Sequence, residues 1–379
     1  FFMEKVKDNI APRAEGIILF PQPGKGVVNG KQIHRTFPVN PTQPITAWGL
    51  IGAGIRAYDH MDGVGNRYGV HTVILEVDGE EVFRSVVDRF AYEENRYINS
   101  WTHGQYMKSF IEPGNRLRML HASNGNRGLV EINEERPYRF VYTLSDALGN
   151  TSKVRFTVQG KNTEIHPVEH REKYAFKWDR TNYLQEPGLE LVVLRGMLYD
   201  DVWLDYSVRA DSGDVAFTYQ LHNKRVPLHG ACEMRIGLRR DRLEDKSKYY
   251  VAGVTARGGK YSIGGTYEDG FMKVRIRDLG TYTVAVDTVP PEIIPLNPGQ
   301  WGRTGRITLK AKDKETGINS YRGTIDGKYA LFGKPNSISG NLVCELDPKH
   351  VKKGGRHTVE MTVTDGRGNR TTEEFHFVW

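Results

Sequence analysis

One pattern occurs twice in this 379-residue chain: a strand-like run, the motif D-x-x-G-N, and a second strand-like run. The first motif spans residues 146–150 and the second spans residues 365–369. The aspartate side chain can cap such a turn, and Gly-Asn tolerates left-handed backbone. A repeated strand-turn-strand unit predicts that the two regions share one antiparallel fold.

The two copies also agree upstream of this motif. Each has an aspartate before a proline-bearing entry strand, an aspartate at a strand end four residues before a glycine, and an Asp-Gly dipeptide typical of tight hairpins. The matched pairs are Asp8 with Asp287, Asp59 with Asp313, and Asp78-Gly79 with Asp326-Gly327. The first and last domains are therefore predicted to be the same immunoglobulin-like β-sandwich, the first enlarged by inserted loops.

Strand patterns dominate the rest of the chain, and helical periodicity is scarce. Short β-branched or aromatic runs bounded by Gly, Asn, Asp or Pro predict strands near 71–77, 138–144, 153–158, 190–194, 215–221, 249–254, 271–277, 281–286, 306–311 and 357–363. Residues 93–100 and 123–128 suggest either loop or a turn or two of helix. The fold class is therefore all-β, with three consecutive β-sandwich domains.

Polar, proline-bearing linkers at 159–167 and 286–291 place the domain limits. The predicted domains are an immunoglobulin-like sandwich with inserted loops at 1–160, a middle β-sandwich of a different type at 161–286, and an immunoglobulin-like sandwich at 287–379.

Composition excludes several classes of protein. No run of 18 apolar residues exists, so no membrane span is expected. The net charge is +7, but 53 basic residues are interleaved with 46 acidic ones and accompany no basic helix, so no nucleic-acid binding is expected. A basic surface predicts weak, salt-sensitive retention on an anionic glycan layer. The two cysteines, Cys232 and Cys344, fall in different predicted domains, and we expect unpaired buried thiols.

Two histidine patterns could suggest zinc. Residues 166–170 read H-x-x-E-H, but Pro167 directs the first histidine toward extended backbone, whereas the motif needs both imidazoles on one helix. His222, His229 and Cys232 supply three ligands, too few for a closed structural site. We interpret both sets as non-metal residues.

Acidic residues offer weaker candidates. Glycoside hydrolysis needs two carboxylates across a cleft, and the adjacent pairs at 93–94, 134–135 and 200–201 are interpreted as solvated turns. Asp59, Asp62 and Asp78 could instead frame a calcium site in sandwich loops, although their spacing is not that of an EF-hand. For Asp8 and Asp287 we predict turn capping. No nucleophile motif or phosphate loop is present, so no catalytic residue and no metal ligand is predicted.

Long motifs resemble one protein type over nearly the whole chain. They are Trp48-Gly-Leu-Ile-Gly-Ala-Gly-Ile-Arg-Ala-Tyr-Asp59, Tyr68-Gly-Val-His-Thr72, Asp88-Arg-Phe90, Met107-Lys-Ser-Phe-Ile-Glu-Pro-Gly-Asn-Arg-Leu-Arg118, Pro227-Leu-His229, Asp245-Lys-Ser-Lys-Tyr249, Ala285-Val-Asp-Thr288 and Ser320-Tyr-Arg-Gly-Thr-Ile-Asp-Gly327. The chain resembles the C-terminal, non-catalytic region of envelope LytM-type (lysostaphin-like, Peptidase_M23 family) zinc metallopeptidases of Bacteroidetes-type bacteria.

The resemblance implies that catalysis and the accessory role belong to different domains. Such enzymes bind zinc with H-x-x-x-D and H-x-H and cut peptidoglycan, and no histidine of this chain fits either motif. Zinc is therefore expected only in an upstream peptidase domain, and the start of the chain resembles a position just after such a domain. The implied function is an accessory region that positions, regulates or targets a peptidoglycan endopeptidase in the periplasm or cell envelope. The alternative is a stand-alone envelope binding or structural protein that docks to a protein complex or a glycan.

Aromatic residues in the inserted loops of the first domain are the candidate contacts. Trp101, Tyr97 and Tyr106 could stack on sugars or on a partner. The alternative is ordinary packing of a long loop against its own sandwich.

Overall fold

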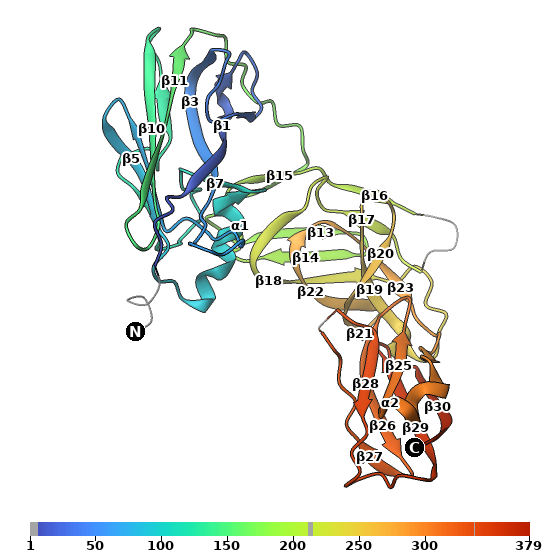
Figure 1. The fold of residues 1–379 in the computed structure, drawn as a ribbon. Helices are drawn as coiled ribbons and strands as arrows, with labels where there is room; N and C mark the ends of the chain where they lie inside the picture. Colours follow the sequence, from blue (N-terminus) through green and yellow to red (C-terminus); the bar gives the residue numbers. More distant parts are fainter. Residues whose placement is uncertain (1–6, 211–214, 337) are drawn as a thin grey trace. The chain divides into compact units, whose positions relative to one another are not determined.

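A computed structural model describes residues 7–210, 215–336 and 338–379. The protein is all-β and built of β-sandwiches, which confirms the predicted fold class (Figure 1). The chain divides into two compact units, unit 1 with residues 1–181 and 195–203, and unit 2 with residues 182–194 and 204–379. The three predicted domains are a finer division and stay a prediction. No helix within the described residues is long and apolar enough to cross a membrane.

In the described part of unit 1, eleven strands join in one sheet. Its main path runs β2-β1-β3-β11-β10-β4-β5-β8, while β6 and β7 pair with each other, and β7 and β9 pair with β3. Strands β3 and β11 pair in parallel, with Ile45 opposite Val158. The strands are β1 (Arg13–Val28), β2 (Arg35–Phe37), β3 (Ile45–Tyr58), β4 (Thr72–Val77), β5 (Glu80–Val86), β6 (Thr102–His103), β7 (Tyr106–Lys108), β8 (Leu120–Ala122), β9 (Val130–Ile132), β10 (Pro137–Ser145) and β11 (Thr151–Gly160).

Alternation along β10 shows how these strands build a core. Tyr138, Phe140, Tyr142 and Leu144 are all buried, and the residues between them are more exposed. Successive side chains of a strand point to opposite faces, so this spacing places one face of β10 on the core. The loop after β5 contains a short 3₁₀ helix η2 (Tyr92–Tyr97) and helix α1 (Ile98–Trp101), one of the two alternatives that the sequence suggested for this stretch.

Residues 161–172 form no strand, and a small two-stranded sheet follows from β12 (Tyr174–Phe176) and β15 (Val202–Leu204). The middle sandwich of unit 2 then pairs two five-stranded sheets, β13-β14-β18-β22-β21 and β16-β17-β23-β19-β20. Its elements are β13 (Asn182–Glu186), β14 (Leu189–Val193), β16 (Ser207–Arg209), β17 (Thr218–Gln220), β18 (Val226–Gly237), η3 (Lys246–Lys248), β19 (Tyr249–Val254), β20 (Lys260–Gly264), β21 (Thr266–Glu268), β22 (Phe271–Leu279) and β23 (Thr281–Val286).

The C-terminal sandwich of unit 2 pairs a three-stranded sheet, β24-β25-β28, with a four-stranded sheet, β27-β26-β29-β30. Trp301, Met361 and Phe377 belong to the apolar core of this sandwich. Its elements are β24 (Glu292–Pro295), η4 (Pro298–Gln300), α2 (Trp301–Thr304), β25 (Arg306–Lys312), β26 (Ile318–Ile325), β27 (Lys328–Ala330), β28 (Asn341–Glu345), β29 (Arg356–Asp365) and β30 (Arg370–Val378).

The repeated turns have the same place and the same contacts in both copies. Asp146 connects β10 to β11, and Asp365 connects β29 to β30. In each turn the aspartate Oδ1 accepts from the backbone N–H of the asparagine four residues later, at 2.8 Å and 2.9 Å. The asparagine Nδ2 donates to the carbonyl oxygen of the entry aspartate, Asp8 at 2.9 Å or Asp287 at 3.0 Å. These contacts confirm the predicted repeat.

Candidate functional site

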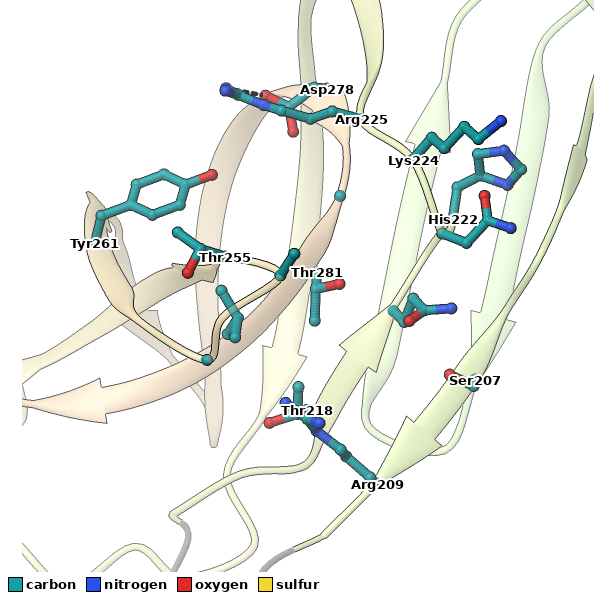
Figure 2. A pocket seen from close by; sticks show the side chains of 16 residues that line it. Ser207, Arg209, Thr218, His222, Lys224, Arg225, Thr255, Tyr261, Asp278 and Thr281 are labelled. Carbon is teal, nitrogen blue, oxygen red and sulfur yellow. Dashed lines mark hydrogen bonds and ion pairs between the residues drawn. The ribbon is translucent and has the colours of Figure 1, made fainter.

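A pocket of about 650 Å³ lies on the middle sandwich, entirely within unit 2 (Figure 2). Its floor is one face of the sheet β16-β17-β23-β19. Strand register brings four lining residues into one row across these strands, because Ser207 pairs with Gln220, Gln220 with Thr281, and Thr281 with Val254. The floor is therefore mostly hydroxyl and amide groups on a paired sheet.

A second pair extends the floor. Arg209 and Thr218 are Cα partners two residues along β16 and β17, so both lie on the same sheet face as Ser207 and Gln220. The intervening residue Tyr219 points to the other face and is 1% exposed in the core. Burial of that opposite face fixes the register of the polar face.

Three segments form the walls of the pocket: residues 222–225 after β17, residues 255–258 after β19, and the end of β22 with the turn to β23, at Asp278 and Gly280. Figure 2 shows Arg225 and Asp278 joined at one rim, with Thr255 after β19 and Tyr261 on β20 nearby. The Arg225 Nη2 donates to Asp278 Oδ2 at 2.7 Å, and this hydrogen bond raises the pKa of Arg225.

The lining carries a net positive charge. Arg209, Lys224 and Arg225 are cationic, whereas Asp278 is the one carboxylate among the lining residues. The Tyr282 hydroxyl donates to Asp278 Oδ1 at 2.8 Å, so both oxygens of this carboxylate are already engaged. A general base needs an oxygen within hydrogen-bond reach of the proton that it abstracts, and both oxygens of Asp278 are already occupied by protein donors. The arrangement fits binding better than proton transfer.

The predicted contact residues of unit 1 differ in exposure. Trp101 is 6% exposed, and its Nε1–H donates to the Lys108 carbonyl oxygen at 3.0 Å, which agrees with the alternative of loop packing. Tyr97 and Tyr106 are half-buried; Tyr97 meets the ring of Tyr199 edge-on at 5.9 Å. Sequence reasoning passed over Tyr92 in the same loop, which is 91% exposed. A role of Trp101, Tyr97 or Tyr106 in binding stays a prediction.

The two histidine patterns are not brought together as metal sites. His166 and His170 lie in irregular backbone, and the His170 ring stacks on Trp203 with centroids 3.7 Å apart. His222 lines the pocket, where its Nδ1 accepts from the Asp205 N–H at 3.1 Å. Cys232 and Cys344 are both free and buried, as predicted.

The suggested calcium frame is separated in the structure. Asp78 caps the turn at the far end of β4, where its carboxylate binds Arg136 Nη1 at 2.7 Å and the Arg139 N–H at 2.8 Å. Asp62 accepts from Asn9 Nδ2 at 2.9 Å. Asp59 instead belongs to a group with Asp8 and Asp146. Spacing along the chain suggested other neighbours for Asp59 than the structure gives, because strand order decides which loops meet.

Comparison with known proteins gives one family match and several distant structures. A Zu5-like domain profile matches residues 173–287, which cover the middle sandwich. No curated protein sequence matches. Among solved structures, a Bacteroides ovatus surface glycan-binding protein (SGBP-B of a mixed-linkage glucan utilization locus), in complex with a heptasaccharide, is 10% identical with a TM-score of 0.15, covering 93% of this chain and 70% of that one.

Two further structures have the same low similarity. A Ca²⁺-stabilized ice-binding adhesin of an Antarctic bacterium is 10% identical, with a TM-score of 0.16 and coverage of 98% of this chain and 90% of that one. Cadherin domains 3–6 of protocadherin gamma B2 are 12% identical, with a TM-score of 0.20 and coverage of 99% and 77%. Values this low define neither the fold nor the ligand of this chain.

Proposed function

We propose that this chain is the accessory region of a cell-envelope peptidoglycan endopeptidase, and that it holds a wall strand in the pocket of the middle sandwich. The observation that carries the proposal is the pocket lining, which places three cationic side chains beside a row of hydroxyl and amide groups on a paired sheet. The motifs that resemble LytM-type enzymes supply the link to the peptidase.

The chemistry of the lining suits peptidoglycan. Its glycan offers hydroxyl and amide groups, and its peptide stems end in carboxylates. The glycan hydroxyl and amide groups can form hydrogen bonds with Ser207, Gln220 and Thr281. The stem carboxylates can be attracted by Arg209 and Lys224. Such a site holds its ligand without changing it, which suits a region that positions a substrate for a zinc domain elsewhere. The proposed location is extracytoplasmic.

The first experiment measures retention of the full chain on purified peptidoglycan across a salt series. We expect retention at low salt that weakens as salt rises, because the Debye length shortens to about 8 Å at physiological ionic strength. Arg209→Ala with Lys224→Ala should abolish most retention. Arg242→Ala is the matched control, because Arg242 is an exposed arginine of the same sandwich outside the pocket and should leave retention unchanged.

Two results would contradict the proposal. One is equal retention of the pocket variant and the wild type. The other is retention on a neutral glucan and not on peptidoglycan, which would favour the stand-alone envelope protein. The link to a peptidase has a separate test: coding sequence upstream of this chain should encode H-x-x-x-D and H-x-H.

A further inference from the structure

Three aspartates from distant parts of unit 1 converge at one end of its sheet. Asp8 precedes β1, Asp59 follows β3, and Asp146 follows β10. Each offers a carboxylate oxygen, and these oxygens lie within 4.8 Å of one another. The group, here called the Asp59 cluster, is independent of the pocket in the middle sandwich.

The negative charge of the Asp59 cluster is not balanced by the described residues. None of its carboxylates forms an ion pair with a lysine or arginine in the described parts of the chain. Asp59 is 6% exposed, and its buried Oδ1 has no hydrogen-bond partner among the described residues. A buried charged oxygen without a partner is costly, so such groups are normally paired or bound to a metal.

Burial makes a charged Asp59 carboxylate costly, and the neighbouring carboxylates of Asp8 and Asp146 add to that cost. A cation at the centre of the cluster would offset both effects.

The equivalent aspartates of the C-terminal sandwich make a useful contrast. Asp287, Asp313 and Asp365 also bring their oxygens within 4.8 Å. Here Asp313 Oδ2 accepts from the N–H groups of Thr316 at 2.8 Å and Gly317 at 2.7 Å, and Asp287 Oδ2 accepts from Thr316 Oγ1 at 2.5 Å. Protein donors serve every aspartate of this second group. In the Asp59 cluster they serve Asp8 and Asp146 but not Asp59 Oδ1, so the inference is confined to this cluster and rests on Asp59.

We propose that the Asp59 cluster binds one divalent cation of the calcium type. Calcium takes oxygen ligands at about 2.3–2.6 Å, so ligands on opposite sides of the ion lie about 5 Å apart. Oxygens within 4.8 Å of one another fit around such an ion. Calcium also accepts irregular geometry, which suits ligands from three separate segments. The ion would fix the entry segment before β1 to the ends of β3 and β10.

The experiment uses the full chain, stripped with a chelator and then dialysed against calcium chloride. Bound calcium is counted by elemental analysis, and thermal unfolding is followed with and without calcium. We expect one calcium per chain and a calcium-dependent rise in melting temperature for the wild type. Asp59→Asn should lose both, whereas the matched control Asp313→Asn, in the equivalent place of the other sandwich, should keep both.

A second variant guards against a folding defect at the buried position. Asp8→Asn changes the less buried member of the cluster, leaves the core untouched, and should weaken calcium binding at least tenfold. The proposal is overturned if the wild type retains no calcium, if Asp59→Asn and Asp8→Asn bind it as the wild type does, or if only Asp313→Asn loses it.

Discussion

Replacing Asn369 with alanine tests the turn that closes the C-terminal sandwich. Asn369 is 8% exposed, and its Nδ2 donates to Asp365 Oδ2 at 2.7 Å and to the Asp287 carbonyl oxygen at 3.0 Å. Alanine removes both bonds but keeps the backbone N–H that donates to Asp365 Oδ1. A hydrogen bond to a charged group contributes about 1.5–3 kcal/mol and a neutral one about 0.5–1.5 kcal/mol. We therefore expect the free energy of unfolding of this sandwich to fall by about 3 kcal/mol.

The two buried cysteines allow the opening of each sandwich of unit 2 to be measured separately. Cys344 on β28 is 5% exposed in the C-terminal core, and Cys232 on β18 is 3% exposed in the middle sandwich. A thiol reagent reaches such a cysteine only after opening, so with rapid reclosing the labelling rate follows the opening equilibrium. A change of about 3 kcal/mol corresponds to roughly a hundredfold faster labelling of Cys344. Mass spectrometry of the two cysteine peptides measures both rates just below the urea transition, where each cysteine is exposed by unfolding of its own sandwich.

Asn319→Ala is the control, since Asn319 is exposed on β26 of the same sandwich. Surface substitutions usually change stability by no more than about 0.5 kcal/mol, so the Cys344 rate should change by about twofold at most. The reasoning fails if Asn369→Ala accelerates the labelling of Cys344 by less than about fivefold, because the turn contacts would then contribute only about 1 kcal/mol to stability. It also fails if the labelling of Cys232 accelerates as much as the labelling of Cys344.

Three further substitutions test single contacts. Ser109→Ala leaves the fully buried Tyr142 hydroxyl without its 2.8 Å partner and should destabilise unit 1 by about 1–3 kcal/mol in urea unfolding, with part regained by adding Tyr142→Phe. Gly302→Ala places a Cβ 1.7 Å from the Val378 carbonyl oxygen and should lower the melting temperature, whereas Gly299→Ala, with open space, should not. The hydrogen bond from His357 lowers the pKa of Asp326. The stability that this carboxylate contributes is therefore fully present above the ordinary pKa of 3.8 and is lost as the pH falls through the lower pKa of the folded state. Asp326→Asn should reduce the pH dependence of acid unfolding, measured by tryptophan fluorescence.

Local patterns were sufficient to predict several of the strands. The alternating runs at 138–144 and 357–363 lie within β10 and β29, and the Asp-Gly dipeptides are the tight turns that their conformational freedom suggested. Asp78 and Asp326 have φ values of 53° and 51°, and each is followed by a glycine that also has positive φ. These features depend on residues next to one another in the chain, so a single sequence is enough to predict them.

The pocket could not be predicted in this way. Its floor depends on the register that sets Ser207 beside Gln220 and Gln220 beside Thr281, and the last of these is 61 positions further along the chain. Serine, threonine and glutamine on an outward strand face are also common without any ligand. His222 was noticed only as a metal candidate, whereas the structure places it in a wall of the pocket.

The two aspartate clusters show how one scaffold can carry two different local chemistries. The sequence pairs Asp59 with Asp313, and the structure places both at the strand end where an entry aspartate and a D-x-x-G-N turn meet. After Asp313 the chain turns back at once, and the N–H groups of residues 315–317 bond to its carboxylate. After Asp59 the backbone instead forms a bridge with Tyr68, and Oδ1 is left without such donors. Because the turn after the aspartate decides whether protein donors reach the carboxylate, the two copies share the position of the cluster, but only the first copy leaves an aspartate oxygen without a protein donor among the described residues.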